Sequence, residues 1–357
     1  MRRAVPVIVV SGFLGAGKTT MVNHLLRSRS GARIGVVVND FGDVSIDALL
    51  VAGAVDGAVR LGNGCICCTA DADTLGEVLG GLVAPAAGLD AVLVETSGLA
   101  EPAAVARMVI ATADPRIGYG GLVYLVDAEN LDALRPDNPE IDRHIALADL
   151  LVVNKVDRVD ARTRDRVLDG VRALNPTAAV VATVDGAVDP GLLLDIPDDR
   201  DTGPRQLELA DLLVAGDDET GHDDHHHAHT RYESLSVTAD RPLHPRRLAA
   251  FLERPPAGVY RIKGVVELAG ADRHRLVVHA VGGLLDVTTA PGRRASAQRS
   301  VRQSDLVAIG AGMDAPTVRA TLQELETRTD ETVDAQAALG VTRHLRTPTP
   351  RRAGAQT

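Results

Sequence analysis

Aromatic residues are scarce in this chain of 357 residues: four tyrosines, three phenylalanines and no tryptophan make up 2% of it. Proteins that bind single-stranded nucleic acid stack bases on aromatic side chains, so this scarcity argues against that class. A formal net charge of −10 argues against general nucleic-acid binding as well, because basic surfaces attract the phosphate backbone. We therefore expect no nucleic-acid partner.

Long hydrophobic runs are also missing. The longest apolar stretches, such as residues 5–10, have the length of a β-strand and fall well short of a membrane-crossing helix. The N-terminal residues include two arginines but lead directly into a strand-sized run, without the longer apolar region and cleavage site of a signal peptide. These absences predict a cytoplasmic protein, in a reducing compartment, with no membrane partner.

Cysteine occurs at only three positions, Cys65, Cys67 and Cys68, all within the stretch LGNGCICCTA. Cysteines that serve as small buried hydrophobic residues would be scattered along the chain. A disulfide is disfavoured, because residues one or two apart rarely reach relaxed disulfide geometry and an odd count leaves one thiol over. The cluster is therefore either a site for a soft metal or a redox-reactive thiol patch.

The length allows two domains, each with its own core. Residues 1–196 alternate short aliphatic runs with helical patterns, which predicts βαβ units and an α/β fold with a mainly parallel sheet covered by helices on both faces. The expected strands are residues 6–10, 34–38, 91–95, 121–126, 150–154 and 178–183, and the expected helices include residues 19–29 and 161–174.

The rest of the chain changes character twice. Residues 197–231 are rich in Asp, Gly and His, which is typical of an exposed linker. Residues 232–328 predict a smaller α+β domain, and residues 329–357 lack apolar periodicity and are expected to be disordered. In the smaller domain we expect strands at residues 232–239, 258–268, 275–283 and 305–312, and helices at residues 245–253 and 315–326.

The segment GFLGAGKTT, residues 12–20, fits the pattern G-x-x-x-x-G-K-[ST] and lies between an expected strand and an expected helix. Glycines let backbone N–H groups approach phosphate oxygens, and the helix N-terminus adds its positive end. Lys18 is expected to reach the β- and γ-phosphates, and the Thr19 hydroxyl to bind Mg²⁺. The expected phosphate-binding residues are Gly12, Gly15, Ala16, Gly17, Lys18, Thr19 and Thr20.

A second motif, NKVD at residues 154–157, selects the base. Guanine presents two adjacent hydrogen-bond donors that one carboxylate can accept, and adenine has no such pair. Asp157 is suited to that role, while Asn154 would brace the loop and the stem of Lys155 would lie along the base. The sequence therefore favours GTP over ATP, with residues 183–186 expected beside the base.

Acidic residues complete the predicted site. Glu95 ends an expected strand, where its carboxylate can order Mg²⁺ or orient the attacking water. Asp40 and Asp43 lie where a switch loop should follow a strand, and the sequence leaves open which of them contacts Mg²⁺ or the water. With Lys18 these three carboxylates form the expected catalytic set, and Thr19 and Glu95 are the expected magnesium ligands.

The segments SGFLGAGKTT, NDFGDVSID, GNGCICC, ETSGLAEP and NKVD resemble, in order and spacing, the motifs of the CobW-type metallochaperone GTPases. Residues 232–328 resemble the C-terminal domain of that family, so the resemblance covers about residues 4–328. It implies a P-loop GTPase that hydrolyses GTP to GDP and phosphate. It also implies binding of a transition metal, most often Zn²⁺, through Cys65, Cys67 and Cys68, and delivery to a metal-dependent client protein. Asp40 departs from the pattern, since many relatives carry Glu there.

Metal chemistry is consistent with that implication. Thiolates favour Zn²⁺ or Cu(I) and bind Co²⁺ more weakly. Three protein ligands leave a tetrahedral site one short, and transfer to a recipient requires such an open position. Two alternatives remain: a zinc-responsive factor whose nucleotide state sets its affinity for a macromolecular partner, and a cobalt chaperone of the same family. A redox sensor is the interpretation that the motifs favour least.

Two further features of the sequence, the histidine-rich linker and the scarcity of lysine, lie outside these motifs. The linker carries His222, His225, His226, His227 and His229 beside Asp223 and Asp224, which predicts either loose metal collection or a plain polar spacer. Lysine is the other feature, because the 38 basic residues include only Lys18, Lys155 and Lys263. We expect the ammonium of Lys263 to meet a confined acceptor, at the domain interface or on the client.

Overall fold

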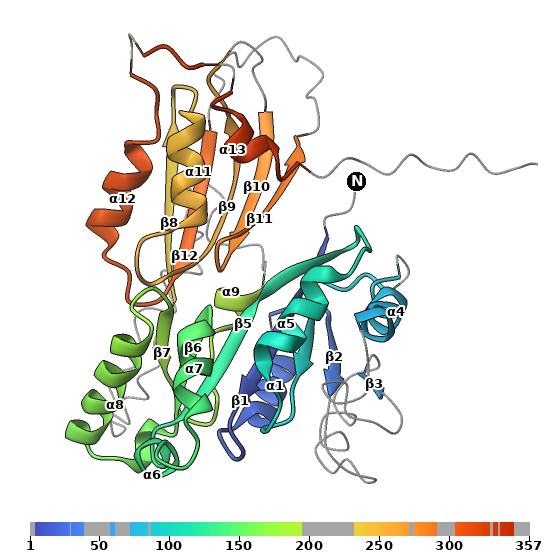
Figure 1. The fold of residues 1–357 in the computed structure, drawn as a ribbon, viewed down its shortest axis with the longest axis vertical. Helices are drawn as coiled ribbons and strands as arrows, with labels where there is room; N and C mark the ends of the chain where they lie inside the picture. Colours follow the sequence, from blue (N-terminus) through green and yellow to red (C-terminus); the bar gives the residue numbers. More distant parts are fainter. Residues whose placement is uncertain are drawn as a thin grey trace, which may run out of the picture.

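The computed structural model describes residues 4–28, 30–38, 58–60, 72–84, 87–194, 232–270, 275–290, 304–328, 331–334 and 336–345. These residues form two β-sheets, each with its own helices, one in the lower half of Figure 1 and one in the upper half. None of the helices within these ranges is long and apolar enough to cross a membrane.

The first sheet has seven strands in the order β3-β2-β4-β1-β5-β6-β7, and every neighbouring pair is parallel. Continuous aliphatic runs form these strands because both faces of the sheet are covered. The strands are β1 (Val5–Gly12), β2 (Ile34–Val38), β3 (Ala58–Arg60), β4 (Ala91–Glu95), β5 (Ile117–Asp127), β6 (Leu150–Asn154) and β7 (Ala179–Ala182). The predicted P-loop α/β architecture is confirmed.

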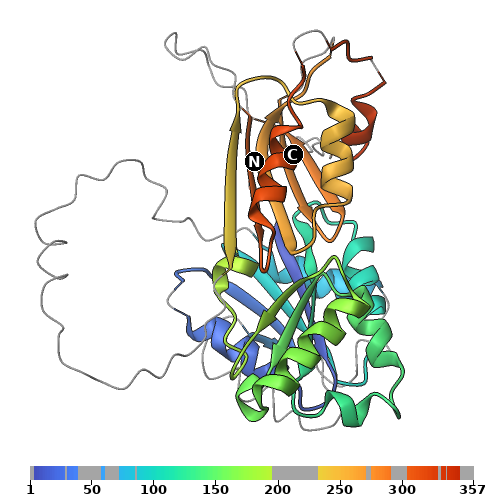
Figure 2. The same ribbon diagram turned by 90° about the vertical axis from the view of Figure 1, so that its left-hand side faces the viewer.

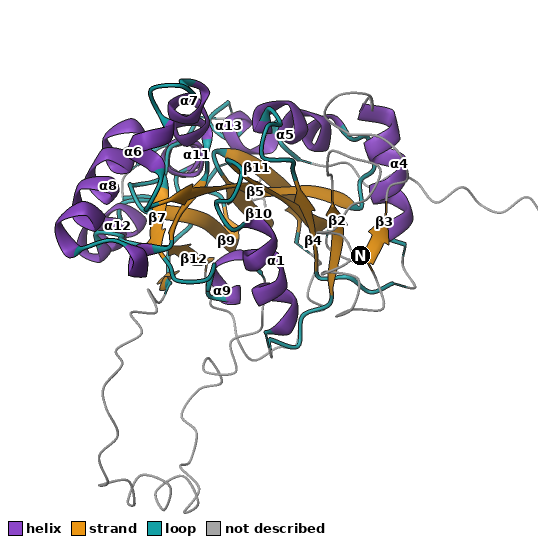
Figure 3. Cartoon of the chain, turned by 90° about the horizontal axis from the view of Figure 1, so that it is seen from below, coloured by secondary structure: helices purple, strands orange, loops and turns teal. Residues whose placement is uncertain are grey.

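Helices lie on both faces of this sheet, as Figure 3 shows from below. One face packs against α1 (Lys18–Arg27) and α9 (Pro190–Leu193). The other face packs against α4 (Ala72–Leu82), α5 (Pro102–Ala111), α7 (Glu140–Leu147) and α8 (Ala161–Leu174). The short α6 (Leu131–Leu134) and the 3₁₀ turn η1 (Val156–Arg158) follow β5 and β6.

The second sheet is antiparallel, with the order β11-β10-β9-β12-β8. Its strands are β8 (Glu233–Ala239), β9 (Val259–Glu267), β10 (Arg275–Val281), β11 (Leu284–Thr289) and β12 (Ser304–Gly310). Its inner face packs against α11 (Pro245–Glu253), α12 (Ala315–Gln323) and α13 (Leu339–Thr342). This arrangement confirms the expected smaller α+β unit.

Two features of this second unit differ from the sequence prediction. Gly282 and Gly283 have φ angles of 57° and 76°, as a two-residue hairpin turn requires, so the chain turns there and β11 follows. Residues 336–345 contain α13, although we expected no order after residue 328. Val341 is fully buried in the core against α11, and this contact holds the short helix in place.

The second unit sits on the N-terminal edge of the parallel sheet, and Figure 2 shows this stacking from the side. The Tyr260 hydroxyl donates to the Gly120 carbonyl at 2.7 Å, and the Gly258 N–H donates to Thr177 at 3.3 Å. The strand β5 bulges at this point, and a Cβ atom on Gly121 would lie 2.4 Å from the Tyr260 oxygen. Among the residues that the structure describes, the second unit contacts the parallel sheet at this N-terminal edge and leaves the opposite edge, where the parallel strands end, to the predicted nucleotide site.

Candidate nucleotide-binding site

The loop between β1 and α1 has a backbone that depends on glycine. Gly15 and Gly17 have φ angles of 77° and 100°, in the left-handed region. A Cβ atom on Gly17 would lie 2.3 Å from the Asn154 side-chain nitrogen, and one on Gly12 would lie 2.6 Å from the Leu125 carbonyl oxygen. The loop therefore packs closely on the ends of β5 and β6, with its N–H groups at the start of α1.

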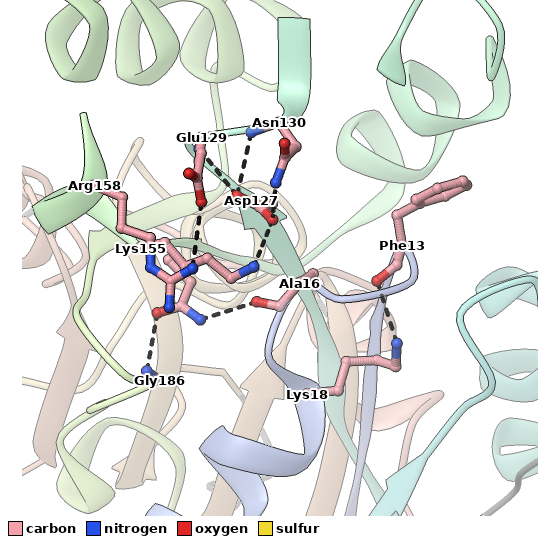
Figure 4. A network of polar contacts seen from close by, with 10 residues as sticks. Phe13, Ala16, Lys18, Asp127, Glu129, Asn130, Lys155, Arg158 and Gly186 are labelled. Atoms are coloured by element: carbon pink, nitrogen blue, oxygen red, sulfur yellow. Dashed lines mark hydrogen bonds and ion pairs between the residues drawn. The ribbon is translucent and has the colours of Figure 1, made fainter. Parts of the chain in front are cut away.

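Lys18 is the first residue of α1, and its side chain curls back over the loop. Its Nζ atom donates to the carbonyl of Gly12 at 3.0 Å. It also donates to the carbonyl of Phe13 at 3.3 Å, the bond drawn in Figure 4. Both acceptors are neutral, so phosphate oxygens arriving in the loop would attract the ammonium more strongly. The structure thus places Lys18 above the loop that it is predicted to serve.

The side chains of Thr19 and Glu95 are in contact, although 76 positions separate the two residues in the sequence. The Thr19 hydroxyl donates to Glu95 Oε1 at 2.6 Å, and Glu95 is only 4% exposed at the end of β4. A hydroxyl and a carboxylate are the hard oxygen ligands that Mg²⁺ takes beside a nucleotide. The residues present therefore fit a magnesium ion at this point.

Asn154 joins three loops. Its Nδ2 atom donates to the Ala16 carbonyl at 2.9 Å, and its Oδ1 atom accepts the Gly186 N–H at 2.9 Å and the Thr183 hydroxyl at 3.2 Å. With 2% of its surface exposed, this amide is satisfied almost entirely by the protein. Residues 183–186 are thereby brought beside the NKVD motif and the phosphate loop.

Lys155 has a left-handed backbone, with a φ angle of 62°, just before η1. Its Nζ atom donates to Asp127 Oδ2 at 2.7 Å (Figure 4). Asp157, two residues further along, belongs to η1 and is exposed, as a carboxylate that meets a base must be before binding.

Asp127 was not identified from the sequence. Burial raises the pKa of its carboxyl, but hydrogen bonds from the Lys155 ammonium and from the Asn130 side chain outweigh that and bring the pKa below its usual range. A clue was present in the sequence, because Asp127 ends an aliphatic strand in the same way as Glu95 does.

Glu101 and His144 form a second link that sequence reasoning missed. Glu101 precedes α5 and follows the loop after Glu95, and its Oε2 atom lies 3.3 Å from His144 Nε2 and 2.8 Å from Arg143 Nη2. Burial raises the pKa of Glu101, but His144 and Arg143 outweigh it and lower the pKa overall. The start of α5 is therefore tied to α7, the helix that leads into β6.

Several predicted site residues lie outside the described residues. They are Asp40, Asp43, Cys65, Cys67, Cys68 and the linker residues 222–229. Within the ranges that the structure does describe, no group of three or more His, Cys, Asp and Glu side chains could hold a metal ion. Lys263 is half-buried on β9 in the second sheet, opposite His279 of β10, and so lies away from the nucleotide site.

Both units match known protein families. Residues 6–182 match the CobW/HypB/UreG nucleotide-binding domain, and residues 232–326 match the cobalamin synthesis protein cobW C-terminal domain.

Named relatives match over part or nearly all of the chain. A zinc chaperone CobW from a Sinorhizobium species is 30% identical over 359 residues, covering 90% of this chain and 97% of that protein. The zinc chaperone YjiA of Escherichia coli is 30% identical over 196 residues, covering 54% of this chain and 61% of that protein. The crystal structure of zinc-bound YjiA GTPase is 22% identical, with a TM-score of 0.43, and covers 91% of this chain and all of that one.

Proposed function

Because the chain belongs to the CobW family of P-loop GTPases by both of its domains, we propose that it is a GTP-hydrolysing metallochaperone. In this proposal it binds Zn²⁺ through Cys65, Cys67 and Cys68 and passes the metal to a client protein under control of the nucleotide. Relatives that bear the names zinc chaperone and zinc-regulated GTPase metalloprotein activator support zinc as the cargo.

The observation that best supports selective binding of GTP is the position of Asn154. Its bonds to Ala16 and Gly186 fix the separation between the phosphate loop and the loop that would read the base. A guanine placed beside Lys155 can then give its two edge donors to Asp157. Adenine has no such donor pair, so this arrangement favours GTP.

The proposed binding and hydrolysis of the GTP phosphates depend on Lys18, Thr19 and Glu95. On GTP binding, the Lys18 ammonium would exchange its bonds to Gly12 and Phe13 for phosphate oxygens. Mg²⁺, when bound, neutralises charge on the phosphates, and Thr19 and Glu95 are the residues that would hold it. Glu95, with Asp40 or Asp43, would orient the attacking water.

The topology supports a metal site near the nucleotide. Because the sheet is parallel, Arg60 at the end of β3 lies at the same edge as Gly12 and Glu95. Only residues 61–64 separate Arg60 from Cys65. We infer that the thiolates belong to this edge, where a change at the γ-phosphate can alter their geometry.

The proposal is tested by measuring zinc affinity in three states: without nucleotide, with GDP, and with Mg²⁺ and a non-hydrolysable GTP analogue. We expect one tightly bound Zn²⁺ in the GTP-analogue state, weaker binding with GDP, and loss of the tight site when all three cysteines become serine. Full-affinity binding by the triple serine variant, or equal affinity in all three states, would overturn the proposal. Co²⁺ as a competitor in the same titration distinguishes the two cargoes.

A further inference from the structure

We propose that Asp127 is a positioning residue for guanine recognition, and that it acts by holding the side chain of Lys155 along the base pocket. The inference rests on the proposed GTP binding, and it adds a residue outside the NKVD motif to the base-reading apparatus. It concerns the end of β5, a strand that contributes no residue to the phosphate loop.

Asp127 is itself held by several donors. Besides Lys155, it accepts hydrogen bonds from the Asn130 side chain at 2.9 Å, from the Glu129 N–H at 3.0 Å and from the Asn130 N–H at 3.3 Å. These contacts fix the carboxylate at the end of β5 and leave it 6% exposed. An anchor that is already rigid loses little further entropy when it binds the lysine ammonium.

The register of the sheet places this anchor beside the base-reading loop. Asp127 pairs with Asn154 between β5 and β6, and the Ala128 N–H donates to the Asn154 carbonyl at 3.0 Å. Lys155 follows Asn154, so its side chain must cross back from the loop after β6 to the end of β5. Figure 4 shows the ammonium directed at Asp127 from the Lys155 loop.

This path has a chemical consequence. With the backbone fixed in a left-handed conformation and the ammonium pinned at 2.7 Å, both ends of the Lys155 side chain are held. The methylene stem between them then forms a fixed apolar edge against which a purine ring can lie. Lysine has four rotatable bonds, so without Asp127 the stem would have to be ordered anew for every nucleotide bound.

The stem meets the face of a base and not its hydrogen-bonding edge. Loss of Asp127 should therefore weaken GTP and ITP by the same factor, because guanine and hypoxanthine share their ring face and differ in the exocyclic amine. Loss of the Asp157 carboxylate should weaken GTP more than ITP, because only guanine offers the second donor. The ratio of GTP affinity to ITP affinity therefore distinguishes a residue that positions the Lys155 stem from one that recognises the hydrogen-bonding edge of the base.

The experiment is a double-mutant cycle on the full chain, with GTP and ITP affinities measured for wild type, Asp127→Asn, Lys155→Met and the double variant. We expect Asp127→Asn to weaken both nucleotides about ten-fold, mainly through faster dissociation, and to have no further effect in the Lys155→Met background. Asp142→Asn is the matched control, because Asp142 holds Arg135 through two bonds of 2.7 Å and is not among the hydrogen-bond partners of Asp127 or Lys155. The control should leave both affinities unchanged.

Two results would overturn the inference. The first is that Asp127→Asn leaves the nucleotide affinities unchanged. The second is that Asp127→Asn weakens nucleotide binding by the same factor whether position 155 is lysine or methionine. The second would mean that Asp127 acts through the fold of the loop, and a fall in the unfolding midpoint of Asp127→Asn alone would accompany it. Failure of the proposed function looks different, because the wild type itself would then bind GTP no better than ATP.

Discussion

The side-chain amide of Asn154 donates to the carbonyl of Ala16 at 2.9 Å, which joins the NKVD loop to the predicted phosphate loop, 138 positions apart in the chain. The opposite atom of the same amide accepts from Gly186 and Thr183. One buried side chain therefore sets the relative position of three loops that belong to three different strands.

Replacing Asn154 with Ala should weaken both folding and nucleotide binding. The change removes three hydrogen bonds and leaves buried partners unsatisfied, which predicts a loss of about 2–3 kcal/mol in the free energy of unfolding. Urea denaturation measures the first effect, and GTP binding well below the unfolding transition measures the second. A variant as stable as wild type would show that the three loops hold their positions without this amide.

Glu95→Gln should separate binding from hydrolysis. The amide keeps an oxygen for the Thr19 hydroxyl, so the loop should keep its shape, but the charge that we propose to order Mg²⁺ and water is lost. We expect GTP affinity to change only a few-fold and single-turnover hydrolysis to fall by about 100-fold. If hydrolysis stays at the wild-type rate, the catalytic carboxylate is elsewhere, with Asp40 and Asp43 the next to test.

Asp149 should make stability depend on pH in a direction opposite to most carboxylates. Its Oδ2 atom accepts from the Tyr119 hydroxyl at 2.6 Å and from the Leu122 N–H at 2.8 Å, but burial dominates and raises the pKa of the carboxyl. A raised pKa means that the folded state holds the proton more tightly than the unfolded chain. The stability from this group is therefore fully present below the ordinary Asp pKa of about 3.9 and is lost as the pH rises through the raised value.

Asp149→Asn removes that titration while keeping an oxygen for Tyr119 and Leu122. The difference in unfolding free energy, variant minus wild type, should therefore rise as the pH increases from acidic values towards neutrality. Chemical denaturation across this range measures the difference, and Asp137→Asn on the exposed α6–α7 connection serves as the control. A difference that stays flat with pH would mean that Asp149 titrates in the folded protein as it does in the unfolded chain.

The contact between Tyr260 and Gly120 should stabilise the docking of the two domains. Tyr260→Phe keeps the ring in its place but removes the hydrogen bond to the Gly120 carbonyl, at an expected cost of about 0.5–1.5 kcal/mol. Gly121→Ala should cost more, because its Cβ atom would meet the Tyr260 ring and its φ angle of 111° disfavours a side chain. Thermal unfolding ranks the two variants, and the reverse order would refute the role of the bulge.

The central strands could be predicted because each is a continuous aliphatic run, and β2, β4 and β6 begin and end where the sequence indicated. The strand β5 begins four residues earlier than expected. Gly118, Gly120 and Gly121 resemble a loop in sequence, yet all three lie in β5, where the register shifts after Tyr119 and Gly121 receives the ring of Tyr260 from the other domain. The tertiary contact with Tyr260 explains Gly121, and the close approach of Ile8 in β1 explains Gly120.

Part of the candidate site could be predicted from the sequence as well. Glycine spacing and the NKVD motif predict Lys18, Thr19 and Asn154 as site residues without a structure, because the chemistry of phosphate and guanine favours those residue types. Asp127 and the pair Glu101–His144 could not be found in this way. Their partners lie 28 and 43 positions away, and only the pairing of strands and the packing of helices bring them together.

The central claim is that the nucleotide state controls release of the metal, and a single-turnover experiment tests it most directly. Protein loaded with one Zn²⁺ and one GTP is mixed with Mg²⁺ and a chromogenic zinc chelator, while phosphate formation and zinc transfer are followed together. The account predicts that zinc leaves at the rate of hydrolysis, and that Glu95→Gln slows both by the same factor. Zinc release that is equally fast with a non-hydrolysable GTP analogue would contradict it.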